Sequence, residues 1–236
     1  MIIDITRCNY APGYLPKATQ GFFNPFFAAA NVAFRREALR ETGGFDPNCA
    51  TGEDVDISIR VSRAGWELWY EPDAVVNHQD PHTFRQLLRQ WFGYGLGHAY
   101  VYKKHVERSR LQIYWPGGKA ADRFSAARPY GARCILDLPF PCYGVVFLSG
   151  YHLFHLALLG TLIASFAHAT AVAIGAGVIA LAAGLNYATI RFDWRRPFNS
   201  LAMLGLRYAG DTAFVAGALL GGIRERALFL QATRTR

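Results

Sequence analysis

Residues 52–65 read G-E-D-V-D-I-S-I-R-V-S-R-A-G and predict a single helix with defined ends. Apolar residues recur through this segment at helical spacing, and Gly65 is the residue type that most often follows the last turn of a helix. The acidic pair Glu53 and Asp54 stands in the first turn, where the helix dipole stabilises negative charge. The segment is therefore expected to be a helix that carries two carboxylates at its N-terminus.

Two short strands are expected after this helix. Residues 66–70 contain aromatic β-formers, and residues 74–77 look like a second, buried strand that ends at His78. Because Trp66 and Trp69 lie in the first of these strands, we expect both of them in the core.

A second helix is predicted over residues 83–101. Together with the predicted strands, the two helices indicate that residues 1–138 form an α/β domain. Arg85 and Arg89 lie four positions apart on one face, and arginine forks suit diphosphate recognition. Solvated helix charges are the alternative reading of these arginines. Trp91 follows closely, as a sugar platform or as a core aromatic residue.

The composition changes after residue 138. Residues 141–167 and 170–190 contain no Asp, Glu, Lys or Arg, which predicts two membrane spans. A buried soluble hairpin is the alternative. Basic residues flank the pair on the side of residues 1–138 and are absent from the joining turn, so the positive-inside rule predicts a multi-pass protein of the cell membrane with its large domain in the cytoplasm.

The last apolar segment, residues 198–230, is interrupted by Arg207 and Asp211. Both would be costly at the middle of a bilayer unless they pair along the helix. An interfacial amphipathic helix is favoured over a third span, with the remaining arginines on anionic lipid headgroups. Residues 139–236 are accordingly expected to form a membrane region.

The net charge of +8 would fit nucleic acid, an anionic membrane or a phosphorylated substrate. The basic residues form no long tract, so nucleic acid is not expected as a partner. The four cysteines lie far apart without a C-x-x-C pair, which favours reduced structural thiols in a cytoplasmic setting.

Several motifs stand in a fixed order along the chain. A-A-N-V-A-F-R-R-E-A-L covers residues 29–39, G-G-F-D covers 43–46, E-D covers 53–54, and the segment from A-G-W to V-V-N-H covers 64–78. In this order and spacing they resemble family-2 glycosyltransferases of the GT-A fold, a Rossmann-like α/β fold, over residues 21–100. The resemblance implies inverting transfer of a sugar from a nucleotide-sugar donor to a lipid-linked or cell-wall glycan acceptor at the membrane.

The resemblance also implies roles for individual residues. Asp54 would be the general base, beside Glu53, although an acidic pair at a helix start can also be a simple cap. Asn31 belongs to the small-residue motif and is expected at the substrate. His78 would bind a divalent cation, Mn or Mg, unless it is an ordinary buried histidine. In the family the metal-binding D-x-D ends a strand before the small-residue motif, whereas Asp56 follows that motif and lies on a helix. Asp56 is therefore expected to be a solvated or capping carboxylate and not part of the metal-binding D-x-D.

The nucleotide-binding half of such an enzyme would need on the order of a hundred residues before Gly21. We expect this donor half to be absent from the chain or to be supplied by a second chain, and the chain alone to be inactive. Two alternatives stay open, namely a noncatalytic membrane subunit that keeps the acceptor-side fold and a basic protein that binds anionic lipid.

Overall fold

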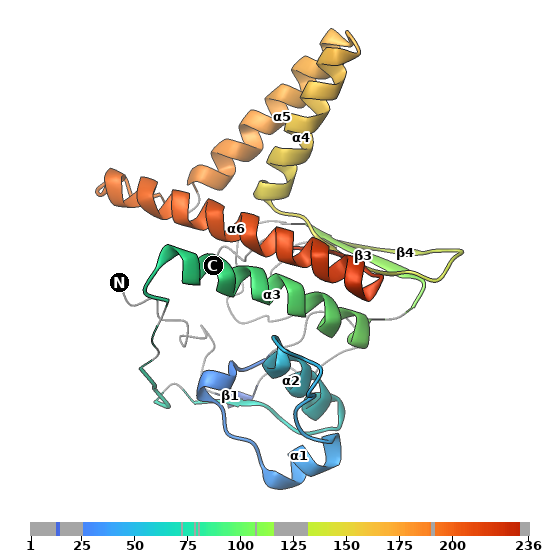
Figure 1. Ribbon diagram of the computed structural model, residues 1–236, viewed down its shortest axis with the longest axis vertical. Coiled ribbons are helices and arrows are strands. Elements are labelled where there is room, and N and C mark those ends of the chain that lie inside the picture. Colours follow the sequence, from blue (N-terminus) through green and yellow to red (C-terminus); the bar gives the residue numbers. More distant parts are fainter. Residues whose placement is uncertain are drawn as a thin grey trace.

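The computed structural model describes residues 13–14, 26–71, 73–77, 79, 81–106, 108–115, 132–189 and 192–231. These residues form six α-helices, one 3-10 helix and six strands, which confirms an α/β protein. The helices α4 and α5 project from one end, α3 and α6 lie side by side in the middle, and α1 and α2 lie at the other end (Figure 1). The elements are β1 Gly13–Tyr14, η1 Ala29–Asn31, α1 Arg36–Thr42, α2 Glu53–Arg63, β2 Trp69–Tyr70, α3 Phe84–His105, β3 Arg110–Trp115, β4 Ala132–Asp137, β5 Tyr143–Phe147, α4 Gly150–Phe166, α5 Thr170–Thr189, α6 Pro197–Glu225 and β6 Leu228–Leu230.

Helices α1 and α2 form a small unit with its own core. Helix α1 ends at Thr42 and is capped by Gly43, whose φ of 80° is left-handed, and α2 begins directly after Gly52, whose φ of 82° is also left-handed. Glycine adopts this conformation without the steric cost that a Cβ brings. The two helices bury one cluster between them, made of Ala38, Ile57, Val61 and Leu68.

The segment after α2 differs from the prediction. Strand β2 contains only two residues and pairs antiparallel with β1, and residues 74–77 form no strand, so the second predicted strand is wrong. The side chains of this segment are not buried, since Val75 is 73% exposed, and the Ala74 main-chain oxygen accepts a hydrogen bond from the Asn31 side chain at 2.6 Å. Trp66 packs against the α1–α2 core as expected, whereas Trp69 is half exposed and its predicted core position is wrong.

The predicted helix over residues 83–101 is confirmed as α3 and continues to His105. Its N-terminus is a capping box, in which the Thr83 side chain accepts from the Gln86 N–H and the Gln86 side chain accepts from the Thr83 N–H. This cap fixes the first turn of α3 where the chain enters from residues 79–82.

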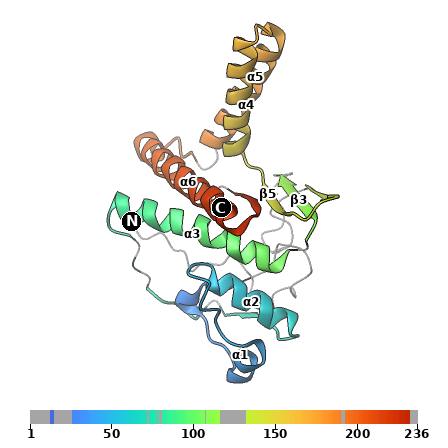
Figure 2. The ribbon, with the colours of Figure 1, turned by 45° about the vertical axis from the view of Figure 1, so that its right-hand side comes forward.

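Helices α3 and α6 approach each other closely at glycines and are adjacent in both views (Figures 1 and 2). A Cβ at Gly95 of α3 would lie 2.1 Å from the Phe214 main-chain oxygen, and a Cβ at Gly217 of α6 would lie 2.1 Å from that of Phe92. No side chain fits at such distances. The glycines therefore let the two backbones come into contact, as small residues do between closely packed helices.

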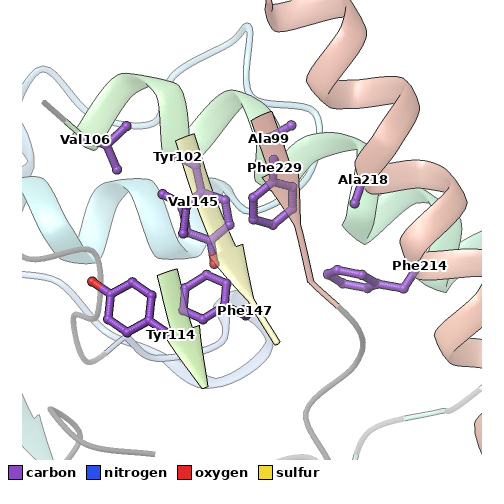
Figure 3. Packing of buried hydrophobic residues seen from close by; sticks show 9 residues of the cluster. All are labelled: Ala99, Tyr102, Val106, Tyr114, Val145, Phe147, Phe214, Ala218 and Phe229. Atoms are coloured by element: carbon purple, nitrogen blue, oxygen red, sulfur yellow. The ribbon is translucent and has the colours of Figure 1, made fainter. Parts of the chain in front are cut away.

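A four-stranded mixed sheet completes the domain in the order β4-β3-β5-β6. Strand β3 pairs antiparallel with β4 and parallel with β5, and β5 pairs parallel with β6. Its buried side chains meet those of α3 and α6 in the main core (Figure 3). There the ring of Tyr102 lies 4.2 Å from that of Phe229, and the ring of Tyr114 stacks on Phe147 at 4.8 Å.

The sheet corrects the predicted membrane span over residues 141–167. Residues 143–147 form β5, whose Val145 and Phe147 are buried in the core, so the apolar helix α4 starts only at Gly150. Within the described residues, α5 is the single helix that is long and apolar enough to cross a membrane, and α4 is a shorter apolar helix of 17 residues. The structure therefore does not support the predicted multi-pass arrangement.

The predicted helix over residues 198–230 is present as α6 but ends earlier. It stops at Glu225, and Leu228–Leu230 join the sheet as β6. Its interrupting charges both contact Tyr187 of α5. The Tyr187 hydroxyl donates to Asp211 at 2.6 Å, while the Arg207 guanidinium lies 3.8 Å from the centre of the Tyr187 ring and donates to its main-chain oxygen. These contacts fasten the α4–α5 hairpin to α6.

Candidate functional site

The first turn of α2, which carries the Glu53–Asp54 pair, is held against α3. The Thr51 hydroxyl donates to the main-chain oxygen of Gly93 at 2.8 Å. Thr51 occupies the space left by another glycine, because a Cβ at Gly97 would lie 1.7 Å from the Thr51 Oγ1. The position of the acidic pair is thus set by a close contact between two elements that are distant in sequence.

Asp54 is half-buried beside the 3-10 helix η1. Its carboxylate accepts hydrogen bonds from the Ala29 N–H at 3.3 Å and from the Val55 N–H at 2.8 Å. Burial raises the pKa of Asp54 above its usual value, and the charge of Glu53 adds to this, whereas the Val55 hydrogen bond opposes it. A carboxylate with a raised pKa is a stronger base than an ordinary surface aspartate.

Asn31 lies close to Asp54 because both belong to the contact between η1 and α2. Its neighbour Ala29 binds the Asp54 carboxylate, and Asn31 itself holds the segment before residue 78 through the Ala74 main-chain oxygen. The structure thus brings Asn31, Asp54 and residues 74–77 together. The predicted metal ligand His78 lies outside the described residues.

The predicted diphosphate-binding residues lie on the first turns of α3. Arg85 and Arg89 are both exposed. Arg89 precedes Gly93 by four residues, which is about 6 Å along the axis of α3. The main-chain oxygen of Gly93 is the acceptor of the Thr51 hydroxyl. Trp91 points to the other neighbour of α3, where its ring lies 6.4 Å from that of Phe214 in α6. Arg89 is therefore four residues from the point where α3 contacts Thr51, and Trp91 lies between α3 and α6.

Asp56 corrects a prediction, because it is not a solvated or capping carboxylate. It is completely buried and accepts hydrogen bonds from the Arg60 side chain at 2.7 and 2.9 Å. It also contacts Nε2 of His105 at 2.8 Å and Nζ of Lys104 at 3.0 Å. Burial alone would raise the pKa of Asp56, but the hydrogen bonds from His105, Arg60 and Lys104 outweigh it and hold this pKa below the usual range.

The partners of His105 assign its tautomer. Arg63 has only N–H donors and contacts Nδ1 at 3.2 Å, so Nδ1 is the acceptor and the ring proton lies on Nε2, facing Asp56. His105 therefore donates from Nε2 to a buried carboxylate. The sequence shows the Asp56–Arg60 pair at four-residue spacing, but not that the end of α3 would supply the other donors.

The G-G-F-D turn enters the same network through Asp46. Its carboxylate accepts from Nζ of Lys104 at 2.7 Å and from the Tyr100 hydroxyl at 2.8 Å. The Lys104 hydrogen bond, followed by those from Asn48 and Tyr100, lowers the pKa of Asp46 to about 2. The turn, α2 and the end of α3 are thus joined through buried or half-buried charges.

Residues 19–190 match the family described as glycosyl transferase family group 2. The chain belongs to this family. The matched region contains all the sequence motifs quoted for residues 29–78 and extends to the end of α5. It therefore includes both partners of the contact between η1 and Asp54.

Three curated relatives show how far this similarity extends. The chain is 35% identical over 88 residues to a pre-mycofactocin glycosyltransferase of Mycobacterium tuberculosis, covering 36% of the chain and 18% of the relative. It is 29% identical over 96 residues to the succinoglycan biosynthesis protein ExoA of Rhizobium meliloti, covering 41% and 29%. It is 30% identical over 104 residues to the O-antigen chain rhamnosyltransferase WbaN of Salmonella anatum, covering 42% and 33%. The chain therefore spans at most a third of the length of these three relatives, and no solved structure gives a significant match.

Family-2 glycosyltransferases commonly use divalent cations. Among the residues that the structure describes, no group of three or more His, Cys, Asp or Glu side chains could hold one. Glu53 and Asp54 alone do not make a ligand set for such an ion. The described residues thus do not fit a metal site, and the predicted cation depends on His78 and other positions outside them.

Proposed function

We propose that this chain carries the acceptor side of a GT-A glycosyltransferase that inverts the configuration of the transferred sugar. The observation that supports this most is the placement of Asp54. Its half-buried carboxylate has a raised pKa and is held by η1 on one side and by the start of α2 on the other. A general base needs both a fixed position and a pKa closer to the working pH than that of a free aspartate.

In the proposed reaction Asp54 removes the proton of the acceptor hydroxyl. The hydroxyl oxygen forms a bond to the anomeric carbon while the bond from that carbon to the diphosphate oxygen breaks. The electron pair of the broken bond leaves with the nucleoside diphosphate, and the proton stays on Asp54. Glu53 lies beside the base and raises its pKa through its charge.

Recognition of the diphosphate is proposed for Arg85 and Arg89. Both are exposed on α3, and Arg89 is one helical turn from the Gly93 oxygen that seats the start of α2. Asn31 and Trp91 are proposed to shape the substrate site, although the ring of Trp91 contacts α6. His78 remains a proposed cation ligand, and the proposed proton transfer to Asp54 does not involve it.

We propose that a second polypeptide holds the donor nucleotide. The quoted motifs resemble the acceptor side of the family, and the chain spans only a part of its relatives. The isolated chain is accordingly expected to be inactive. The relatives include a rhamnosyltransferase and glucomannan mannosyltransferases, which suggests nucleotide-activated rhamnose and mannose as first donors to test.

The α4–α5 hairpin is proposed to enter the membrane and to present a lipid-linked or cell-envelope glycan acceptor to the domain. Helix α5 has 20 residues, about 30 Å of helix, which matches the hydrocarbon thickness of a bilayer. Its apolar side chains are exposed and not packed as in a soluble core, for example Val178 at 62% and Leu181 at 63%. Arg195 and Arg196 follow α5 and would face the cytoplasm with the domain.

The test is sugar transfer in membranes. Membranes of the native host without its own copy of the gene are supplied with the chain and with radiolabelled GDP-mannose, dTDP-rhamnose or UDP-glucose. Label appearing in the lipid or glycan fraction only when the chain is present supports the proposal. If no donor gives chain-dependent product, while the chain is present and folded in these membranes, the alternative of a noncatalytic subunit is favoured.

A further inference from the structure

One ammonium group holds both ends of the segment that carries Asp54. Nζ of Lys104 lies 2.7 Å from the Asp46 carboxylate, which precedes α2, and 3.0 Å from the Asp56 carboxylate, which lies two residues after Asp54. Lys104 belongs to the last turn of α3, and α2 lies against α3 (Figure 2). Residues 46–56 are therefore tied to α3 on both sides of the Glu53–Asp54 pair.

The charges at this junction are closely matched. The carboxylates of Asp46 and Asp56 face the cations of Lys104 and Arg60, and Nε2 of His105 contacts Asp56. Among the ion pairs of the described residues, Lys104 is the cation that contacts both carboxylates. Without its charge, two carboxylates that share a partly buried site would repel each other, and the turn would lose its attachment to α2.

We propose that Lys104 is a positioning residue for Asp54. It does not touch the substrate, but it fixes α2 and the G-G-F-D turn on α3 so that the Asp54 carboxylate stays against η1. The inference deepens the proposed function, because it assigns Asp54 the role of base, but its physical content is the attachment of α2 to α3.

The neighbouring residue provides a matched control. Lys103 forms an ion pair with Glu225 of α6 at 3.2 Å, and its side chain is 38% exposed compared with 32% for Lys104. The two lysines thus have the same chemistry and similar exposure, but one holds α2 and the other holds α6. Lys103→Met removes an equal charge from the same helix turn without touching the Asp46–Asp56 junction.

The deciding experiment is amide hydrogen exchange of the full chain in detergent, read on peptides from α2 and from α6. We expect Lys104→Met to accelerate exchange in α2 about tenfold or more while α6 stays as in the parent, because local opening is governed by the contacts of each segment. Lys103→Met is expected to leave α2 unchanged. If Lys104→Met leaves exchange in α2 unchanged, or accelerates α2 and α6 equally, the proposal is wrong.

Two further variants keep the test decisive. Asp46→Asn breaks the link from the turn while leaving Asp56 with its donors, so it is expected to accelerate exchange in α2 even if Lys104→Met does not fold. Lys104→Arg keeps the charge and is expected to restore most of the protection. No acceleration with Asp46→Asn, or no recovery with Lys104→Arg, contradicts the proposal.

Activity adds a separate readout in membranes where the parent transfers sugar. Lys104→Met is expected to lower kcat about 10-fold to 100-fold, because a base displaced by about 1 Å loses catalysis on this scale, while KM for the donor changes less than about twofold. A parent without activity overturns the proposed function, and the exchange result still decides the role of Lys104.

Discussion

The Thr51 hydroxyl donates to the main-chain oxygen of Gly93 at 2.8 Å, across a gap of 42 residues. The bond is possible because Gly97, one turn further along α3, has no side chain to fill the space that Thr51 occupies. On α3, Gly95 serves the contact with α6 in the same way. The glycine-rich stretch of α3 thus gives the helix two close contacts, one to Thr51 just before the acidic pair and one to α6.

Gly97→Ala is expected to destabilise the protein by roughly 1–3 kcal/mol, the usual cost of forcing an extra methyl group into a packed contact. The new Cβ would lie 1.7 Å from Thr51 Oγ1 and 2.4 Å from the Thr51 main-chain oxygen. Urea unfolding of the purified chain measures this loss. The control is Gly205→Ala, since nothing lies within 4 Å of a Cβ at Gly205 and alanine favours the helix by about 1 kcal/mol. Equal stability of the two variants would contradict the described contact.

The network around Asp46 and Asp56 predicts a loss of stability in acid. Both groups have a folded pKa below their ordinary value, so their contribution to stability is complete above about pH 5 and is lost as the pH falls through each folded pKa, which is about 2 for Asp46. Asp46→Asn is therefore expected to destabilise the chain at pH 7 and to have little effect at pH 2. Urea midpoints at both pH values measure this, and a difference of the same size at both would refute the assignment.

The two helices of the site follow from local signals in the sequence. Glycines at positions 52 and 65 flank α2, and its acidic first turn complements the dipole, so its bounds are nearly those expected. Thr83 and Gln86 form the cap that starts α3. Such signals act within a few residues, which is why they could be read without a structure.

The errors have a common physical origin, because they concern partners far along the chain. An apolar run does not reveal whether it pairs in a sheet or spans a membrane, although Val145 and Val146 in residues 143–147 favour a strand. The sequence predicts Asp56 as a surface charge because its donors from α3, Lys104 and His105, lie 48 and 49 residues away along the chain. Buried charge networks are tertiary features.

The membrane proposal predicts the effect of a charge in α5. Val178→Arg places an arginine near the middle of the helix, at an exposed apolar position, and is expected to disfavour insertion by about 3 kcal/mol. The fraction of the chain that stays in carbonate-washed membranes measures insertion. Glu67→Gln, an exposed position outside the hairpin, changes the net charge by the same amount and is expected to have no effect. Unchanged retention of Val178→Arg would mean that the hairpin does not enter the bilayer.

Asp54→Asn tests the account most directly. Burying the charge of Asp54 raises its pKa and costs stability at neutral pH, so the Asn variant is expected to be at least as stable as the parent at pH 7. As a control, Asp137→Asn changes a carboxylate that is 79% exposed in a surface ion pair.

The measurement is the initial rate of sugar transfer in host membranes at equal amounts of folded parent, Asp54→Asn and Asp137→Asn. The account predicts that Asp54→Asn loses about 100-fold or more, the usual loss on removing a general base, while Asp137→Asn keeps the parent rate. A rate for Asp54→Asn within a few-fold of the parent would contradict the assignment of Asp54 as the catalytic base.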